Sequence, residues 1–388
     1  METIFWLGLF CTLYAYFLYP GLLWFLGKLV PRPLALPDNA NAERYAPAVT
    51  LIIPVYNESA VIQSKLDNLA VLQYPRDKLT IRIVSDGSTD DTLTQIKNFS
   101  SDLHIEVLEV QERKGKANAL NTGIAGLQSE LVIFSDASIL LEPESLIEIV
   151  RPFQDPVIGC VSGEDHIPGG GGEGLYGQYE LFLRNRESAL GSIVGASGSF
   201  YAQRSHLCKE FIEGHAPDFL SVLNTVEAHY RAITEPRARG FMSAVKSTSQ
   251  EFDRKVRTLL RGYTALFAKP YLLNPFRFGL FSVFLLSHKL MRWLVPFFLF
   301  AVFFANLALL DDGIYGLFFV LQLLFYGLAG LATTSIAFFQ HSIVSKIPMF
   351  FLMVNLAIAV AWVRYLKGDR QELWNPSQRV TPSQPNQP

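Results

Sequence analysis

The N-terminal segment Ile4 to Gly27 contains no charged residue. About 20 consecutive apolar residues are enough to cross a bilayer as a helix, so this segment predicts a membrane span. A cleaved signal peptide is the alternative, but no basic segment precedes the run and the run is too long for one. Glu2 precedes it and Lys28 and Arg32 follow it, so the positive-inside rule predicts that the chain continues in the cytoplasm.

The C-terminal part predicts about three further spans, at Leu294–Leu310, Gly313–Phe339 and Ile347–Val363. The preceding stretch mixes apolar residues with His288, Lys289 and Arg292, which is typical of a helix that lies in the membrane interface. One plus three crossings would place the C-terminus outside, whereas its basic residues favour the inside. Either the last segment is re-entrant or the region around Phe278 also crosses.

These features divide the chain into six units. We expect an N-terminal transmembrane helix at residues 1–30, a proline-rich linker at 31–47, a cytoplasmic domain at 48–270, an interfacial helix at 271–293, about three transmembrane helices at 294–366 and a polar tail at 367–388. The net charge of −2 gives no basic field of the kind that binds nucleic acid. The three cysteines lack the spacing of a zinc site or a disulfide framework.

The middle of the chain alternates short apolar runs with segments of helical periodicity. The runs predict strands at Val49–Val55, Leu79–Val84, Ile105–Leu108 and Leu131–Phe134, and helices are predicted between them at Ser59–Leu72, Asp90–Phe99 and Lys116–Leu127. Alternation of this kind indicates an α/β domain with a mostly parallel, doubly wound sheet covered on both faces. Ligands of such sheets bind beyond the carboxyl ends of the strands.

Acidic loops follow three of these strands and contain Glu58, Asp86 and Asp136. Asp86 could accept hydrogen bonds from a nucleoside, and Asp136 could hold Mg²⁺ or Mn²⁺ beside a diphosphate. The basic segment 113–116 would add positive charge there, although a solvated turn has the same composition. Each acidic loop could also be an ordinary turn or helix cap. The sequence lacks the glycine motifs of dinucleotide dehydrogenases and P-loop NTPases after the first strand.

The ordered motifs in this segment resemble glycosyltransferase family 2. They are Ile53-Pro54-Val55-Tyr56-Asn57-Glu58, Asp86-Gly87-Ser88-Thr89-Asp90, Lys114-Gly115-Lys116-Ala117-Asn118-Ala119-Leu120-Asn121 and Ser135-Asp136-Ala137. The family, which includes cellulose, hyaluronan and poly-N-acetylglucosamine synthases, has a GT-A fold that binds a nucleotide-sugar. The resemblance covers about residues 48–270. It implies that the donor, a UDP-sugar or similar, is bound by Pro54, Tyr56, Glu58, Asp86, Lys116, Asp136 and Arg254.

The same resemblance implies an acceptor side. Residues 195–202 look like the family's glycine-rich acceptor loop, with Gly195, Ser197, Gly198 and Ser199 on the acceptor side. Asp218 lies where the family has its catalytic base, which would deprotonate an acceptor hydroxyl and give inversion in one step. A helix N-cap is the structural alternative for Asp218. Arg254 matches the arginine of the processive motif and would face the diphosphate.

Two departures from the family pattern limit what the resemblance implies. Ser138 replaces the second aspartate of the Asp-x-Asp metal motif, so the metal would have fewer protein ligands. Glu251 and Lys255 replace the glutamine and tryptophan of the processive motif, which leaves single addition and polymerisation both open.

Two functions are therefore compared. The first is an inverting hexosyltransferase of the inner cell membrane that transfers a sugar to a lipid-linked or polysaccharide acceptor. It would act in exopolysaccharide or cell-envelope glycan synthesis, with other envelope or export proteins as candidate partners. The second is a non-enzymatic transport or scaffold protein with a degenerate nucleotide-sugar domain. The joint presence of Asp86, Asp136, Asp218 and Arg254 favours the enzyme, and the scarcity of charge in the spans disfavours transport.

Overall fold

The computed structural model describes residues 1–34, 45–167, 171–243, 248–334 and 342–370. Most of the linker expected at 31–47 and of the tail expected at 367–388 lies outside these ranges. So do residues 335–339 of the span expected at Gly313–Phe339.

The first half of the catalytic domain is a parallel sheet, as predicted. Its strands are β1 (Val49–Val55), β2 (Leu79–Asp86), β3 (Ile105–Val110) and β4 (Leu131–Ser135), and the helices between them are α3 (Ile62–Ala70), α4 (Thr92–Asn98) and α5 (Lys116–Ile124). β1 pairs with both β2 and β4, and every residue of β1 is buried. The register sets Val55 opposite Ser85, so the loops after β1 and β2 leave the sheet at the same edge.

The second half extends this sheet with strands of mixed direction. It adds β5 (Leu140–Leu141), β6 (Ile158–His166), β7 (Phe200–Arg204) and β8 (Arg231–Phe241), together with α6 (Ser145–Val150) and α8 (Pro217–Glu227). The strand order is β3-β2-β1-β4-β7-β6-β8-β5, with β7 antiparallel to both β4 and β6. The predicted α/β class with a mostly parallel sheet is therefore confirmed, and β7 brings the loop before it next to the end of β4.

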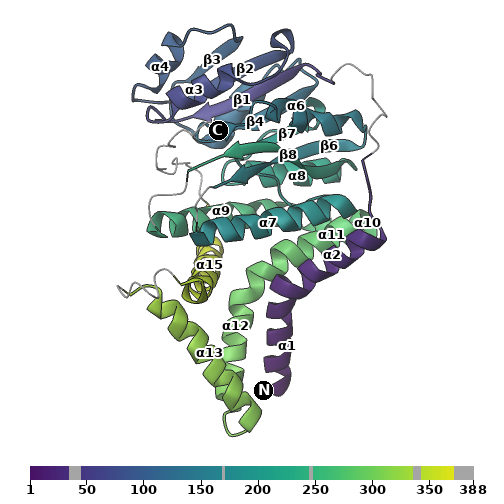
Figure 1. Ribbon diagram of the computed structural model, residues 1–388, viewed down its shortest axis with the longest axis vertical. Helices are drawn as coiled ribbons and strands as arrows, with labels where there is room; N and C mark the ends of the chain where they lie inside the picture. Colours follow the sequence, from purple (N-terminus) through teal and green to yellow (C-terminus); the bar gives the residue numbers. More distant parts are fainter. Residues whose placement is uncertain (35–44, 168–170, 244–247, 335–341, 371–388) are drawn as a thin grey trace.

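Two long helices form a layer beneath the sheet, between it and the apolar helices (Figure 1). These are α7 (Gly171–Leu190) and α9 (Thr248–Ala268). The end of α9 packs on the membrane helices through the fully buried Tyr263, whose ring lies 4.7 Å from the rings of both Trp293 and Trp362. The catalytic domain is thus joined to the apolar helices by an aromatic contact as well as by the chain.

Within the described residues, four helices are long and apolar enough to cross a membrane: Glu2–Leu29, Leu280–Leu307, Gly313–Leu331 and Val344–Leu366. The first comprises α1 (Glu2–Leu13), a π-helical segment (Tyr14–Leu18) and α2 (Tyr19–Leu29), and the second comprises α11 (Leu280–Phe284), a π-helical segment (Leu285–Met291) and α12 (Arg292–Leu307). They pack side by side, with the Tyr14 hydroxyl 2.8 Å from Ser287 Oγ. Residues 280–293 thus begin a continuous longer helix, whereas we expected a separate interfacial helix over 271–293.

The remaining apolar helices, α13 (Gly313–Leu331) and α15 (Ile343–Leu366), differ in direction. In Figure 1, α1 and α12 lie close to the vertical and α13 lies obliquely, whereas α15 is strongly foreshortened beneath α9. The Tyr263 hydroxyl on α9 donates to the Ile358 carbonyl of α15 at 3.2 Å. Arg370, just after α15, lies 3.6 Å from where a Cβ of Gly214 would be, so the described end of the chain returns to the catalytic domain.

Candidate active site

Asp86 ends β2 and anchors the loop before α5. Its side chain is buried and accepts hydrogen bonds from the backbone N–H groups of Lys114 at 3.0 Å and Gly115 at 2.8 Å. Gly87 follows with φ of +69°, and a Cβ there would stand 2.9 Å from the Arg113 nitrogen. Only glycine combines this backbone conformation with so close an approach. The predicted acidic loop and the predicted basic segment are therefore packed together at the sheet edge.

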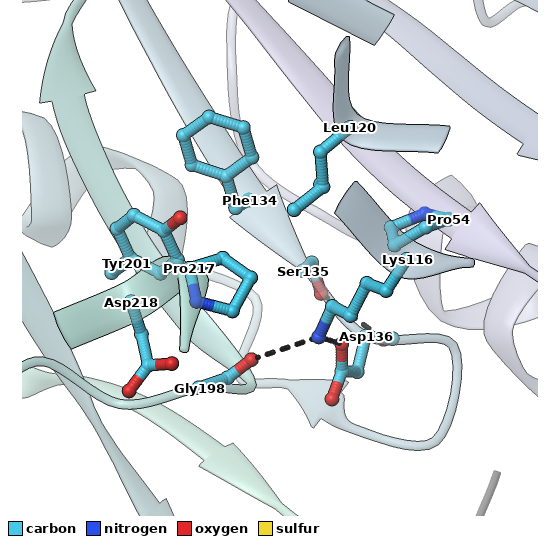
Figure 2. Close-up of a pocket in the computed structure, with 10 residues that line it drawn as sticks. All are labelled: Pro54, Lys116, Leu120, Phe134, Ser135, Asp136, Gly198, Tyr201, Pro217 and Asp218. Atoms are coloured by element: carbon cyan, nitrogen blue, oxygen red, sulfur yellow. Dashed lines mark hydrogen bonds and ion pairs between the residues drawn. The ribbon is translucent and has the colours of Figure 1, made fainter. Parts of the chain in front are cut away.

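Asp136 follows β4 and faces the same edge. Lys116, the first residue of α5, places its ammonium 2.6 Å from Asp136 Oδ1 and 3.3 Å from the Gly198 carbonyl oxygen (Figure 2). The Asp136 N–H donates to the Ser199 carbonyl at 2.9 Å, because the adjacent residues Ser135 of β4 and Phe200 of β7 are paired. The loops expected to bind the donor and the acceptor are thus held to each other at Asp136.

Lys65 supports this loop from inside the domain. It lies on α3, is fully buried, and donates to Ser135 Oγ and to the Ile139 carbonyl, both at 2.8 Å. Burial lowers the pKa of Lys65 to about 7, although the nearby charge of Asp136 opposes this shift. The sequence suggested only an amphipathic helix here, and nothing in its spacing distinguishes Lys65 from an exposed lysine.

The loop after β1 supplies the other donor-side residues. The Arg113 guanidinium stacks 3.9 Å from the centre of the Tyr56 ring, and Pro54 lines the small pocket that Figure 2 shows beside Lys116. The backbone N–H of Glu58 donates to Thr92 Oγ1 at 2.9 Å, while Glu58 lines the larger cavity described below. Pro54 near the end of β1 and Tyr56 and Glu58 in the loop after it therefore lie at the same edge as Asp86 and Asp136.

Asp218 lies in the first turn of α8, across the pocket from Lys116 (Figure 2). The N-cap of α8 is Ala216, so the alternative role of Asp218 as a helix cap is not adopted. A Cβ on Gly198 would lie 3.6 Å from the Asp218 carboxyl group, which leaves the carboxylate beside a loop without side-chain bulk. Burial raises the pKa of Asp218, and the ammonium groups of Lys116 and Lys289 oppose that shift.

The loop expected on the acceptor side is shaped by Ser197. Its Oγ accepts hydrogen bonds from the N–H groups of Ser199 and Phe200, both at 3.1 Å, and donates to Asp165. Ser197 therefore holds the turn, while its neighbours Gly195, Gly198 and Ser199 also line the larger cavity.

The larger cavity, of about 410 Å³, lies between these loops and α9. Glu58, Asp136 and Asp218 line it on the domain side, and Arg254, Arg257 and Arg261 line it from α9. Arg254 is paired with Glu251 at 2.8 Å, and Lys255 pairs with the same carboxylate at 2.9 Å. Glu251 and Lys255, which both depart from the family motif, are therefore partners of each other.

Arg257 and Arg261 were not predicted as site residues. Their spacing from Arg254, three and seven positions along a helix, is the signal that could have found them, because such residues share one face. Burial, together with the charge of Arg257, lowers the pKa of Arg261 to about 10. The crowding of cations on this face indicates a site for a multiply charged anion.

A second cavity, of about 340 Å³, shares Asp218 and Lys289 with the first and reaches the membrane helices. Trp293, Val354 and Ile358 line this cavity and not the first. Arg292 Nη1 lies 2.6 Å from Glu180 Oε1 on α7, and His288 lies 3.0 Å from Glu180 and 2.7 Å from Glu187. The basic residues of the expected interfacial helix instead face inward, as charges in membrane segments usually do.

The metal prediction rests on Asp136. The described residues contain no group of three or more His, Cys, Asp or Glu side chains that could hold a metal ion. Mg²⁺ commonly binds through one or two carboxylates together with substrate phosphates. Asp136, outside any such group and beside the arginine face of α9, fits a cation shared with a bound diphosphate, and does not fit a site formed by the protein alone.

Comparison with known proteins agrees with this geometry. Residues 50–210 match the model of glycosyl transferase family 2. Poly-beta-1,6-N-acetyl-D-glucosamine synthases of Staphylococcus aureus strain COL and Staphylococcus epidermidis are 32% and 29% identical to the chain over 146 residues, which is 37% of this chain and 31% of theirs. The chain thus spans about a third of the length of these curated relatives.

A solved structure resembles nearly the whole chain. It is a mannosyltransferase of Pyrobaculum calidifontis in complex with GDP-Man and Mn²⁺, 25% identical, with a TM-score of 0.73. The similarity covers 94% of this chain and 98% of that one, so the apolar helices are included as well as the α/β domain. The α/β domain is GT-A-like, and the family resemblance seen in the motifs is confirmed.

Proposed function

We propose that this chain, which carries a glycosyltransferase family 2 domain at residues 50–210, is an inverting hexosyltransferase. It moves a sugar from a nucleotide-sugar, a UDP-sugar or a relative of one, to a lipid-linked or polysaccharide acceptor at the membrane. The observation that carries the proposal is the meeting of Asp136, Asp218 and the three arginines of α9 in one cavity. These are the groups that a diphosphate leaving group and a hydroxyl nucleophile require.

The donor is proposed to lie along the edge formed by β1, β2 and β4. Tyr56 and the loop anchored by Asp86 would receive the nucleoside, and Lys116 with the arginines of α9 would bind the diphosphate. Asp136 would hold Mg²⁺ or Mn²⁺, which when bound neutralises charge on the leaving diphosphate. The relative solved with GDP-Man and Mn²⁺ supports this assignment by analogy.

In the transfer step, an acceptor hydroxyl attacks the anomeric carbon from the side opposite the diphosphate. The new carbon–oxygen bond forms as the bond to the donor phosphate breaks, and the nucleoside diphosphate leaves with that electron pair. Asp218 takes the hydroxyl proton, and a single displacement inverts the anomeric configuration. Burial raises the pKa of Asp218 and so makes it a stronger base than a solvated aspartate.

The proposed location is the inner cell membrane, with the catalytic domain in the cytoplasm. The basic residues after the first span support this side of the membrane. The foreshortened α15 beneath α9 and the position of Arg370 beside Gly214 support a last segment that does not cross, which reconciles the basic end of the chain with its cytoplasmic side. Exopolysaccharide or cell-envelope glycan synthesis, with envelope or export proteins as partners, is the proposed setting.

The test is transfer from a panel of UDP- and GDP-sugars by the full chain in membranes, scored by released nucleoside diphosphate. Asp218→Asn should lower kcat by roughly 100- to 10,000-fold, because it removes the base without changing the shape of the side chain. Asp91→Asn, which makes the same change at an exposed position, should retain wild-type activity. In the wild type, kcat should fall as the pH drops through the raised pKa of Asp218. Absence of any donor turnover, or equal activity of Asp218→Asn, would contradict the proposal.

A further inference from the structure

A lysine ammonium lies where the two cavities meet. Lys289 lines both of them, and its Nζ lies 3.4 Å from where a Cβ of Gly195 would be. Across the described parts of the chain, the Lys289 side chain makes no hydrogen bond or ion pair with another residue. The Phe219 ring lies 5.8 Å from its Nζ. The charges of Glu180, Glu187 and Asp218 act on this ammonium, but none of these carboxylates forms an ion pair with it. A half-buried cation that makes no direct polar contact costs solvation energy, so its place in a cavity points to an anionic ligand.

The other cations of the second cavity, which reaches the membrane helices, have protein partners. Arg292 is paired with Glu180 at 2.6 Å, and Arg254 and Lys255 are paired with Glu251 at 2.8 and 2.9 Å. Five cationic side chains line this cavity against three carboxylates, so its lining is positive overall. Lys289 is therefore the group most available to a ligand that enters this space.

The lining combines charged and apolar residues. Asp218 and Lys289 line the part that the second cavity shares with the first, whereas Trp293, Val354 and Ile358 line the second cavity alone. The last three belong to helices that are apolar and long enough to span a membrane. A cavity with both kinds of lining matches a molecule with a polar headgroup and a hydrocarbon tail.

We infer that the acceptor is a membrane amphiphile whose headgroup carries both a phosphate and a hydroxyl. Lys289 binds the phosphate, Asp218 receives the hydroxyl, and the tail lies against α12 and α15. The two charged groups face Gly195 and Gly198, which lie three residues apart in one loop. This assignment rests on the proposed function, since it takes Asp218 as the base.

Lipid binding by the purified full chain in a neutral detergent tests the inference without a nucleotide-sugar. The probes are phosphatidylglycerol, which has a phosphate and two hydroxyls, a neutral glucosyl diacylglycerol, and soluble glycerol phosphate, each titrated by native mass spectrometry. Phosphatidylglycerol should bind at least about tenfold more tightly than either of the others. Lys289→Gln should abolish that preference and Lys289→Arg should keep it, since a charged hydrogen bond is worth about tenfold or more in affinity.

The matched control is Lys28→Gln, which removes one positive charge at the end of the first apolar helix, outside both cavities. It should leave the preference for phosphatidylglycerol intact. The inference is overturned if the neutral lipid binds equally well, if Lys28→Gln has the same effect as Lys289→Gln, or if glycerol phosphate binds as tightly as the lipid. Binding of the neutral lipid by Lys289→Gln establishes that this variant is folded. Because no donor is present, a negative result here leaves the proposed transferase activity standing, and absent donor turnover would leave the lipid result standing.

Discussion

Asp86→Asn tests how the donor edge is assembled. The native carboxylate is 1% exposed and accepts two backbone N–H groups, at 3.0 and 2.8 Å. Asparagine keeps one acceptor oxygen and turns an NH₂ group toward the other N–H, so one buried donor loses its partner. That loss costs about 1–3 kcal/mol. A domain stable by about 5–15 kcal/mol stays folded, but the loop of residues 113–116 is loosened.

The cost corresponds to a fall of about 2–12 °C in the midpoint of thermal unfolding, measured by calorimetry in detergent. Hydrogen exchange of the Lys114 and Gly115 amides should accelerate, and the donor KM should rise more than kcat falls, because Lys116 follows directly on this loop. Asp91→Asn is the matched control, since it removes the same charge from an exposed position of the neighbouring loop and should change stability by less than about 0.5 kcal/mol. An unchanged midpoint with unchanged amide exchange would refute the view that Asp86 holds the loop. A lowered midpoint with an unchanged donor KM would refute its link to the donor.

Three further outcomes are expected. Arg261→Gln should raise the donor KM by about tenfold or more with little change in the unfolding midpoint, because it removes one cation from the cavity face; an unchanged KM would separate this residue from the diphosphate. Asp136→Asn should require a higher Mg²⁺ or Mn²⁺ concentration for half-maximal transfer, and a metal titration identical to that of the wild type would remove Asp136 as a ligand. Burial would raise the pKa of Glu227, but hydrogen bonds from Lys209 and Lys269 outweigh it and lower the pKa to about 2. Its stabilising effect is therefore complete above the usual carboxyl range and is lost as the pH falls from about 4.5 toward 2. The midpoints of wild type and Glu227→Gln should converge over that interval, and a constant difference would contradict the assignment.

The first half of the sheet was predictable because its strands are continuous apolar runs. The run Val49–Val55 was predicted with its observed bounds, and the next three strands were predicted one or two residues too short at their carboxyl ends. At those ends the side chains become polar, so hydrophobicity no longer marks the strand. The backbone nevertheless stays paired, as Asp86 does with Val110.

The second half could not be ordered from the sequence. β5 is only two residues long and pairs with β8, about 100 positions later, so no local pattern indicates the partner. The acceptor side depends on another distant pairing, because β7 must insert beside β4 before residues 195–199 reach Asp136. The family resemblance, rather than periodicity, identified that loop.

The partners of the charged residues in the apolar helices could not be predicted, for a physical reason. A helix with mixed charge and apolar residues usually lies at the membrane surface, and that expectation applied to His288, Lys289 and Arg292. The carboxylates of α7 that lie within hydrogen-bond distance of His288 and Arg292 come about 100 residues earlier in the chain. Periodicity within one helix cannot show a partner supplied by another helix.

The buried ammonium of Lys65 also has a consequence for how the domain folds. Its hydrogen-bond acceptors are Ser135 Oγ and the Ile139 carbonyl, and both belong to the segment that carries Asp136. A partly folded state in which α3 had docked on the sheet before this segment closed would enclose a cation without acceptors, which is costly. Formation of the core around α3 and closure of the Asp136 loop are therefore expected to occur as one cooperative unit. Chains that have acquired a stable core would then already have the donor edge in place.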